Sequence, residues 1–226
     1  MTSGFRLDLH VHSRHSPDSR LTLEQIAGQV PYAGLRGFAL TDHNTVAGHR
    51  ELPDLATRFP SLVVLPGVEV STAEGHLLAY GVDEAPPPHR PVAETAEWVR
   101  AHGGESVLAH PFRLAHGVGR RVAETAPVRG IEVLNGHSSL VANARAELVA
   151  ARRYLAETGG SDVHELSDLG RAFTEFPSDA PSTDDLLESI RKGTVVAGGQ
   201  SLRWPGRLRW GVRTGALLVT RGFRPI

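Results

Sequence analysis

Histidines and carboxylates recur in short groups along this chain, and their types suit metal chemistry. The sequence holds 12 histidines and no cysteine, so any metal must be held by nitrogen and oxygen ligands. Imidazole and carboxylate together suit zinc, manganese or iron(II). The candidate ligands are His10, His12, Asp18, His43, Glu69, His110, His137, Asp162 and His164. The chemistry they indicate is metal-dependent hydrolysis.

The spacing of these residues indicates shared ions. In an extended segment, residues i and i+2 point to the same side, so His10 and His12 can bind one ion. Asp162 and His164 repeat that spacing. A carboxylate such as Glu69 could bridge two ions about 3.5–4 Å apart, as in two-metal hydrolysis. A lone histidine at a strand end is more often solvated or hydrogen-bonded, so the prediction rests on the whole set.

The elements that must position these groups follow a β-then-α pattern. Short apolar runs predict strands, and longer amphipathic segments predict helices, the first beginning at Thr22 with Gln25 completing a capping box. The expected strands cover 5–9, 37–41, 62–66, 67–71, 76–82, 106–109, 130–134 and 159–162, and the expected helices 46–59, 92–102, 140–157 and 183–192. Each ligand group lies at the C-terminal end of an expected strand. Sites in parallel α/β folds assemble at that edge, so the groups should meet in space.

Composition sets the remaining bounds. A chain of 226 residues can form one sizeable core. The net charge of -1 favours neither nucleic acid nor membrane. Residues 1–20 lack a signal-like apolar run and no stretch could span a bilayer, so we expect a cytoplasmic protein. Oligomeric state is not indicated. Residues 201–226 carry arginines but no acid, and we expect this basic extension to pack on or beside a domain of residues 1–200.

The motifs, in their order, resemble those of the PHP superfamily, named for polymerase and histidinol phosphatase. They are DLHVHS, TDHN, PGVEVS, AHP, EVLNG and GSDVH. The resemblance covers roughly residues 5–200 and is closest in kind to small stand-alone metal-dependent phosphoesterases. It implies a distorted β/α barrel with about seven strands and a trinuclear metal site at the C-terminal end of those strands.

The resemblance also implies how the ligands are shared among two or three divalent ions, with zinc, manganese and iron as the candidates. The implied sets are His10, His12, Glu69 and Asp162 for the first ion, Glu69, His110 and His137 for the second, and Asp18, His43 and His164 for the third. Asp18 stands where some members have histidine. Asp42 is expected to orient His43 or to cap a strand end.

The implied mechanism is attack of a metal-bridged hydroxide on phosphorus. The catalytic group would be Glu69, Asp162, His10 and His12. Arg113 and Arg171 are candidate phosphate clamps, because guanidinium matches phosphate in bidentate geometry, although both could be ordinary surface arginines. His76 could line the site and bind substrate, or could be structural.

The leading functional expectation is a phosphoesterase that hydrolyses a small phosphomonoester, with nucleotides among the options. One alternative is an exonuclease or phosphodiesterase on short RNA or DNA. Another is an amidohydrolase-like metalloenzyme, but such enzymes usually bridge metals with a modified lysine, and Lys192 lies outside every motif. A degenerate PHP domain in regulation or assembly is the non-enzymatic alternative. A complete ligand set argues against it.

Overall fold

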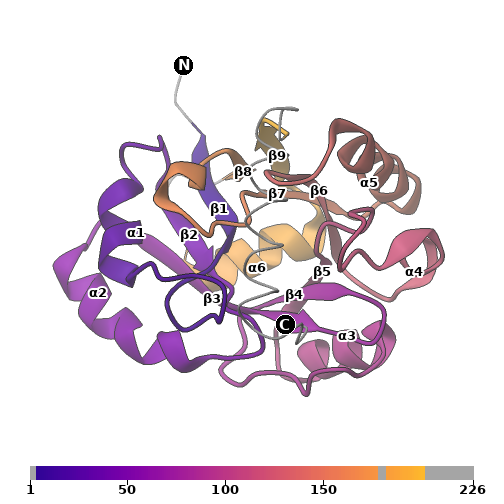
Figure 1. Cartoon of the computed structure of the whole chain (residues 1–226), viewed down its shortest axis with the longest axis horizontal. Helices are drawn as coiled ribbons and strands as arrows, with labels where there is room; N and C mark the ends of the chain where they lie inside the picture. Colours follow the sequence, from indigo (N-terminus) through magenta and orange to yellow (C-terminus); the bar gives the residue numbers. More distant parts are fainter. Residues whose placement is uncertain (1–3, 178–181, 202–226) are drawn as a thin grey trace.

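The computed structural model describes residues 4–177 and 182–201. The extension predicted for 201–226 therefore lies outside the described residues, apart from Ser201. Within the described part, nine strands form one mixed sheet that curves into a nearly closed barrel (Figure 1). The strands are β1 (Phe5–Val11), β2 (Gly37–Leu40), β3 (Val63–Ser71), β4 (His76–Tyr80), β5 (Glu105–Leu108), β6 (Gly130–Asn135), β7 (Ala156–Gly160), β8 (Ala172–Phe176) and β9 (Val196–Gly199). The expected distorted β/α barrel is confirmed, with nine strands in place of about seven.

The strand order explains how distant motifs become neighbours. It runs β7-β6-β5-β4-β3-β2-β1-β8-β9. β1, β2 and β3 are parallel to one another, as are β5, β6 and β7, whereas β4 is antiparallel to both β3 and β5. β8 is antiparallel to β1 and to β9. The ligand-bearing parallel strands therefore end at a common rim.

Two hydroxyl groups join β7 to β8 where the barrel closes. Thr174 Oγ1 donates to the Gly159 carbonyl at 2.9 Å and accepts the Gly159 N–H at 2.8 Å. Ser161 Oγ bonds the carbonyl and N–H of Ala172 in the same way, both at 3.0 Å. A Cβ on Gly159 would lie 2.4 Å from the Phe173 carbonyl oxygen. Glycine thus permits the close approach that these hydroxyls stabilise.

Helices surround the strands and fill one end of the barrel. In the described residues these are α1 (Leu23–Gln29), η1 (Ala47–Glu51), α2 (Leu52–Arg58), α3 (Val92–Ala101), α4 (Gly119–Thr125), α5 (Leu140–Arg153), η2 (Leu166–Asp168) and α6 (Thr183–Lys192). In Figure 1, α1 and α2 lie outside β1–β3, α3–α5 lie on the opposite side, and α6 crosses behind the strands. None of these helices has both the length and the hydropathy that a bilayer span requires.

α6 closes the end of the barrel at which the parallel strands begin. Its Leu186 and Ile190 are buried in one apolar cluster with Leu65 of β3. Arg191 Nε, one residue further on, donates to Glu105 Oε1 at 2.7 Å, and Glu105 is the first residue of β5. Apolar side chains thus fill this end of the barrel, whereas the predicted histidine and carboxylate ligands lie at the other end.

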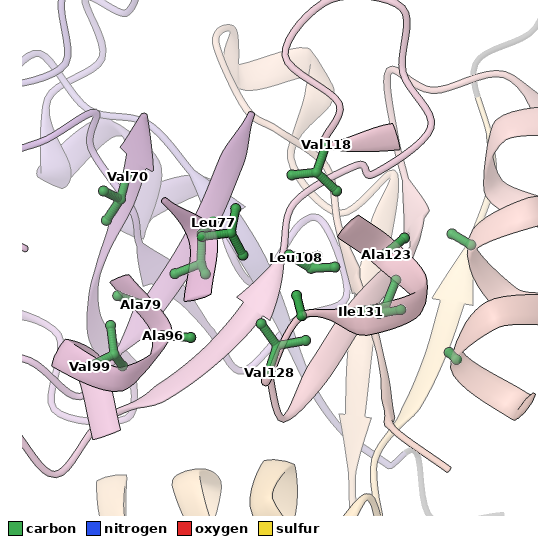
Figure 2. Packing of buried hydrophobic residues seen from close by; sticks show 14 of the residues in the cluster. Val70, Leu77, Ala79, Ala96, Val99, Leu108, Val118, Ala123, Val128 and Ile131 are labelled. Atoms are coloured by element: carbon green, nitrogen blue, oxygen red, sulfur yellow. The ribbon is translucent and has the colours of Figure 1, made fainter. Parts of the chain in front are cut away.

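The largest apolar cluster lies between strands and the helices on their outer side. Figure 2 shows Ala96 and Val99 of α3 and Ala123 of α4 facing residues of β3–β6 such as Leu108 and Ile131. All five side chains are fully or almost fully buried. A third cluster joins α1 and α2 to β2 in the same manner.

The structure differs from the sequence expectations in several bounds. The segments 62–66 and 67–71 form a single strand, β3. The helix expected over 140–157 ends at Arg153, because Tyr154 adopts a left-handed conformation with φ 53° and the chain then enters β7. Helix α6 covers the range expected for it and is capped by Ser182. β8, β9 and α4 were not expected at all. The capping box of Thr22 and Gln25 is confirmed.

Candidate metal centre

The predicted ligands lie at the rim where the parallel strands end. His10 is on β1 and Glu69 on β3, whereas the others follow strands: His12 and Asp18 after β1, His43 after β2, His110 after β5, His137 after β6, and Asp162 and His164 after β7. The end of β1 pairs directly with the segment after β7, since His12 N donates to Val163 O at 3.1 Å and Val163 N to His10 O at 3.0 Å. That pairing brings the His10/His12 pair and the Asp162/His164 pair together, although they are far apart in the sequence.

Gly160 is required for this contact. A Cβ at Gly160 would lie 2.4 Å from His10 Cβ and 2.8 Å from Glu132 Oε1. Only glycine therefore allows β7 to approach the ligands of β1 this closely. The glycine of GSDVH thus has a packing role beside the ligands that follow it.

Glu69 is the centre of the cluster. Its Oε2 lies 3.2 Å from His10 Nε2, 3.3 Å from His12 Nε2 and 3.2 Å from His43 Nδ1. Its Oε1 lies 2.8 Å from His76 Nδ1 and 3.0 Å from His110 Nε2. The Glu69 side chain is 1% exposed, so five imidazole rings surround one buried carboxylate.

Asp162 and Asp18 extend the cluster on either side of His12. Asp162 Oδ1 lies 3.3 Å from His12 Nε2 and 3.7 Å from His10 Nε2. Asp18 Oδ2 lies 2.8 Å from His164 Nε2 and 3.1 Å from His43 Nε2. Three sets of residues could each hold an ion, because within each set one ligand atom per residue lies within 4.8 Å of the others. The sets are His10, His12, Glu69 and Asp162; His12, His43 and His164; and His43, Glu69 and His76.

The ring nitrogens of this cluster fit a cation. His10 Nε2, His12 Nε2 and His43 Nδ1 are buried and have no hydrogen-bond partner among the described residues, although each faces a carboxylate. Burying several carboxylates with neutral imidazoles is unfavourable unless a positive charge compensates them. A divalent ion between these nitrogens and oxygens would satisfy both requirements.

The pKa directions show how strongly the groups interact. Burial disfavours the charged form of Glu69, yet His76 and His10 hold the pKa of that carboxyl well below its usual value. Burial also opposes protonation of His10, but Glu69 and Glu132 raise the pKa of its ring well above the usual value. For His110, burial and Arg113 lower the pKa well below the usual value. Metal binding needs ionised carboxylates and neutral imidazoles, so these directions favour the required forms of Glu69 and His110, whereas His10 would release a proton when a cation binds.

Two further acids, Asp42 and Glu132, lie beside the ligands. Asp42 accepts from Ser13 N at 2.6 Å and from Ser13 Oγ at 2.7 Å, so it holds the loop after His12 and does not orient His43. Glu132 Oε1 lies 2.9 Å from His10 Nδ1. Sequence reasoning missed Glu132, although an acid within the apolar strand of EVLNG was a usable signal.

The structure places the candidate substrate-binding residues at the same rim. Arg113 contacts Asp162 through Nη1. Arg171 Nη2 lies 3.3 Å from Asp168 Oδ1. His76, considered for substrate, instead touches Glu69 within the ligand cluster.

His137 lies outside the three ligand groups. Its ring Nε2 is 3.4 Å from Asp168 Oδ2, and its backbone N–H donates to Asn135 Oδ1 at 3.0 Å. Its ring centroid is 6.3 Å from that of His164. The residue expected to complete the second ion's ligands therefore stands beside the centre, next to the acid that also contacts Arg171.

Two relatives are similar in sequence to part of the chain. A curated protein of Methanocaldococcus jannaschii, Uncharacterized protein MJ1587, is 29% identical over 143 residues, which cover 58% of this chain and 82% of the relative. The phosphoribosyl 1,2-cyclic phosphate 1,2-diphosphodiesterase of Eggerthella lenta is 37% identical over 86 residues, covering 35% of this chain and 32% of that enzyme. The chain thus spans about a third of the length of the second relative.

Solved structures share the fold. An amidohydrolase from Chromobacterium violaceum, solved with bound sulfate and no metal, has a TM-score of 0.63 at 22% identity and covers 84% of this chain and 97% of its own. The lesion-specific endonuclease PfuEndoQ of Pyrococcus furiosus has a TM-score of 0.66 at 18% identity, covering 88% and 60%.

Two family models match the chain in sequence order. The PHP domain matches residues 8–108, which hold five of the predicted ligands, and the PHP-associated family matches residues 141–195, which hold Asp162 and His164. Together they cover more than half of the sequence and leave between them the segment with His110 and His137. With the barrel and the histidine–carboxylate rim in place, this chain belongs to the PHP superfamily.

Proposed function

We propose that this chain is a metal-dependent phosphoesterase whose substrate is a small phosphomonoester. The observation that carries the proposal is the set of five imidazoles around the buried carboxylate of Glu69. Membership of the PHP superfamily supports hydrolysis, and the Eggerthella lenta relative is named for action on a phosphate ester. The sulfate in the Chromobacterium violaceum structure is a tetrahedral dianion, as a phosphate ester group is.

The donor sets support two or three divalent ions, with zinc, manganese and iron as candidates. The first would lie among His10, His12, Glu69 and Asp162, and the third among Asp18, His43 and His164. For the second we propose His76 beside His110, because both rings reach Glu69 Oε1. When bound, the ions would supply a nucleophile at neutral pH and neutralise charge on the phosphoryl oxygens.

The protein's own groups would bind and orient the substrate. Arg113 and Arg171 stand at the rim of the cluster with side chains 13% and 29% exposed. Each guanidinium presents several N–H donors in a plane, which suits two phosphoryl oxygens. Asp168 holds Arg171 in place and also contacts His137. Arg113 and Arg171 would therefore define the phosphate-binding edge of the site.

A second candidate is a phosphodiesterase acting on a small phosphodiester or on short RNA or DNA. The Eggerthella lenta enzyme, 37% identical over its matched part, is named as a diphosphodiesterase and favours this candidate. Binding of nucleic acid would require a continuous basic surface. The arginines of residues 201–226 could contribute to such a surface, but they lie outside the described residues.

A substrate panel separates these candidates. Protein loaded with zinc, manganese or iron(II) would be incubated with phosphorylated metabolites, cyclic and linear phosphodiesters, and short oligonucleotides, with release of phosphate or cleaved product measured. We expect phosphate from monoesters. Cleavage of diesters alone would replace the proposal by the second candidate, and no turnover with any metal would refute both.

Ligand variants test the metal centre itself. His10→Ala and Asp162→Ala should each lose at least one bound metal, measured by elemental analysis, and nearly all hydrolysis of an aryl phosphate. His102→Ala is a matched control, because His102 is exposed at the end of α3 and stacks on Trp98. Full activity in either ligand variant at the metal content of the control would contradict the assignment.

A further inference from the structure

Glu132 occupies a position that no ligand role explains. It lies on β6, its side chain is 1% exposed, and it belongs to none of the three groups that could hold an ion. Its contacts nevertheless reach two strand ends. Oε1 lies 2.9 Å from His10 Nδ1, and Oε2 accepts from the backbone N–H of His110 at 2.8 Å. Asn135 Nδ2 donates to the same Oε2 at 3.1 Å.

The contact with His10 determines which ring nitrogen is available. An ionised carboxylate can only accept hydrogen bonds, so His10 must carry its proton on Nδ1, toward Glu132. In the neutral ring that a metal would bind, the other nitrogen, Nε2, then presents its lone pair toward Glu69 and Asp162, at 3.2 and 3.7 Å. A carboxylate that accepts from the far nitrogen of a metal-bound imidazole fixes the ring and makes it a stronger ligand.

The contact with His110 stabilises an uncommon backbone conformation. His110 has φ 28°, a region that residues other than glycine rarely adopt. Its N–H is held by Glu132 Oε2, and its ring projects Nε2 to within 3.0 Å of Glu69 Oε1. One carboxylate therefore orients a ligand of the first ion and the backbone of a ligand of the second.

We propose that Glu132 is a positioning residue that sets the metal affinity of the centre by holding His10 in its Nδ1-protonated form and fixing the backbone of His110. The inference rests on the proposed metal centre. No Lys or Arg contacts Glu132 among the described residues. A cation bound at His10 Nε2 would place positive charge beside this buried carboxylate.

The geometry makes Glu132→Gln an informative change. Three donors face the two oxygens, from His10, His110 and Asn135. The amide NH₂ of glutamine must face one side or the other. Toward His10, it would force the proton onto Nε2 and remove the lone pair that faces the ion. If the NH₂ faced His110, it would meet two other donors, the backbone N–H of His110 and the Nδ2 of Asn135.

Isothermal titration of zinc or manganese into metal-free protein tests the proposal. Glu132→Gln should weaken the first-bound ion about 10- to 100-fold. Glu105→Gln is the matched control, since Glu105 is a buried glutamate of neighbouring β5 at the opposite end of the barrel, bonded to Arg191. We expect Glu105→Gln to change thermal stability but to leave metal affinity within a factor of two or so of the parent protein.

The outcomes separate this inference from the proposed function. Equal metal affinity in Glu132→Gln and Glu105→Gln would overturn the positioning role while leaving the metal centre intact. An unmodified protein that binds no ion would overturn both. If Glu132→Gln does not fold, Glu132→Asp serves instead, because it keeps the carboxylate but is too short to reach both His10 and His110. Its metal affinity would then be compared with that of Glu105→Gln, and equal affinities would again overturn the positioning role.

A second readout is spectroscopic. Long-range proton–nitrogen NMR of the zinc-loaded protein should show His10 with a protonated, hydrogen-bonded Nδ1 and a coordinated Nε2. That pattern should be lost or exchange-broadened in Glu132→Gln and retained in Glu105→Gln. A His10 signal that is identical in all three proteins would refute the proposed effect on the ring.

Discussion

Replacing Thr174 with valine would test how the barrel closes. β7 and β8 are held across the closure by the hydroxyls of Thr174 and Ser161, and Thr174 is fully buried. Valine has nearly the same shape but lacks the hydroxyl. The change therefore removes the donor to the Gly159 carbonyl and the acceptor of the Gly159 N–H together.

The expected effect follows from those two bonds. Each contributes about 1 kcal/mol net, and a buried N–H left without a partner adds about 1–3 kcal/mol. We expect the free energy of unfolding to fall by roughly 2–4 kcal/mol. Asp162 and His164 follow directly on β7, so loosening the strand should also weaken metal binding.

Urea unfolding in the presence of a chelator measures the effect without a contribution from bound metal. With an m value of about 3 kcal/mol/M, the midpoint should fall by about 1 M. Thr158→Val is the control on β7, because Thr158 is equally buried but makes a single long contact, 3.4 Å to the Ile131 carbonyl. It should lose no more than about 1 kcal/mol. If the two variants were equally stable, the hydroxyl closure would not be what holds the barrel.

Three further predictions concern pH, packing and substrate. Burial opposes protonation of His164, but its hydrogen bond to Asp18 raises its pKa from 6.5 to about 9. The protonated ring should therefore stabilise the metal-free fold fully below pH 6.5, and roughly 3 kcal/mol of that stability should be lost as the pH rises to 9. A urea midpoint that does not change over this pH range would contradict the prediction. Leu186→Ala should lower stability by about 2–5 kcal/mol, because Leu186 fills the barrel end, against less than about 0.5 kcal/mol for exposed Leu148→Ala. Arg171→Ala should raise KM for a phosphate ester about 10-fold or more with unchanged metal content, whereas an unchanged KM would remove Arg171 from the substrate site.

Local sequence patterns predicted most of the secondary structure. The capping box of Thr22 and Gln25 predicted the start of α1, because a cap depends only on neighbours three residues apart. The apolar runs predicted β1 to β6, because burial in a barrel requires continuous apolar side chains. β7 has the sequence AETGG, which is not an apolar run, and only its last two residues fall within the strand expected over 159–162. β8 and β9 escaped detection. β8 alternates buried and half-buried residues over a short length, and β9 is a Gly-rich strand with no fully buried residue.

The direction of β4 could not be read from its residues. Its side chains are all buried, as in a parallel strand, and only its pairing with β3 and β5 shows that it runs antiparallel. Helix α5 was overextended for a similar reason. Its end is set by the left-handed Tyr154 at the turn into β7, and that turn is imposed by the strand's place in the sheet.

What the sequence determined by itself was the chemical identity of the centre: the histidines and carboxylates stand after strands, and parallel strands end at one rim. What only the tertiary structure decided was which of them meet. His76 reaches Glu69, His137 turns to Asp168, and Glu132 supports His10 from a strand 122 positions away in sequence. Spacing along a strand fixes the side to which a residue points, but contact between strands depends on register and curvature, which no local pattern contains.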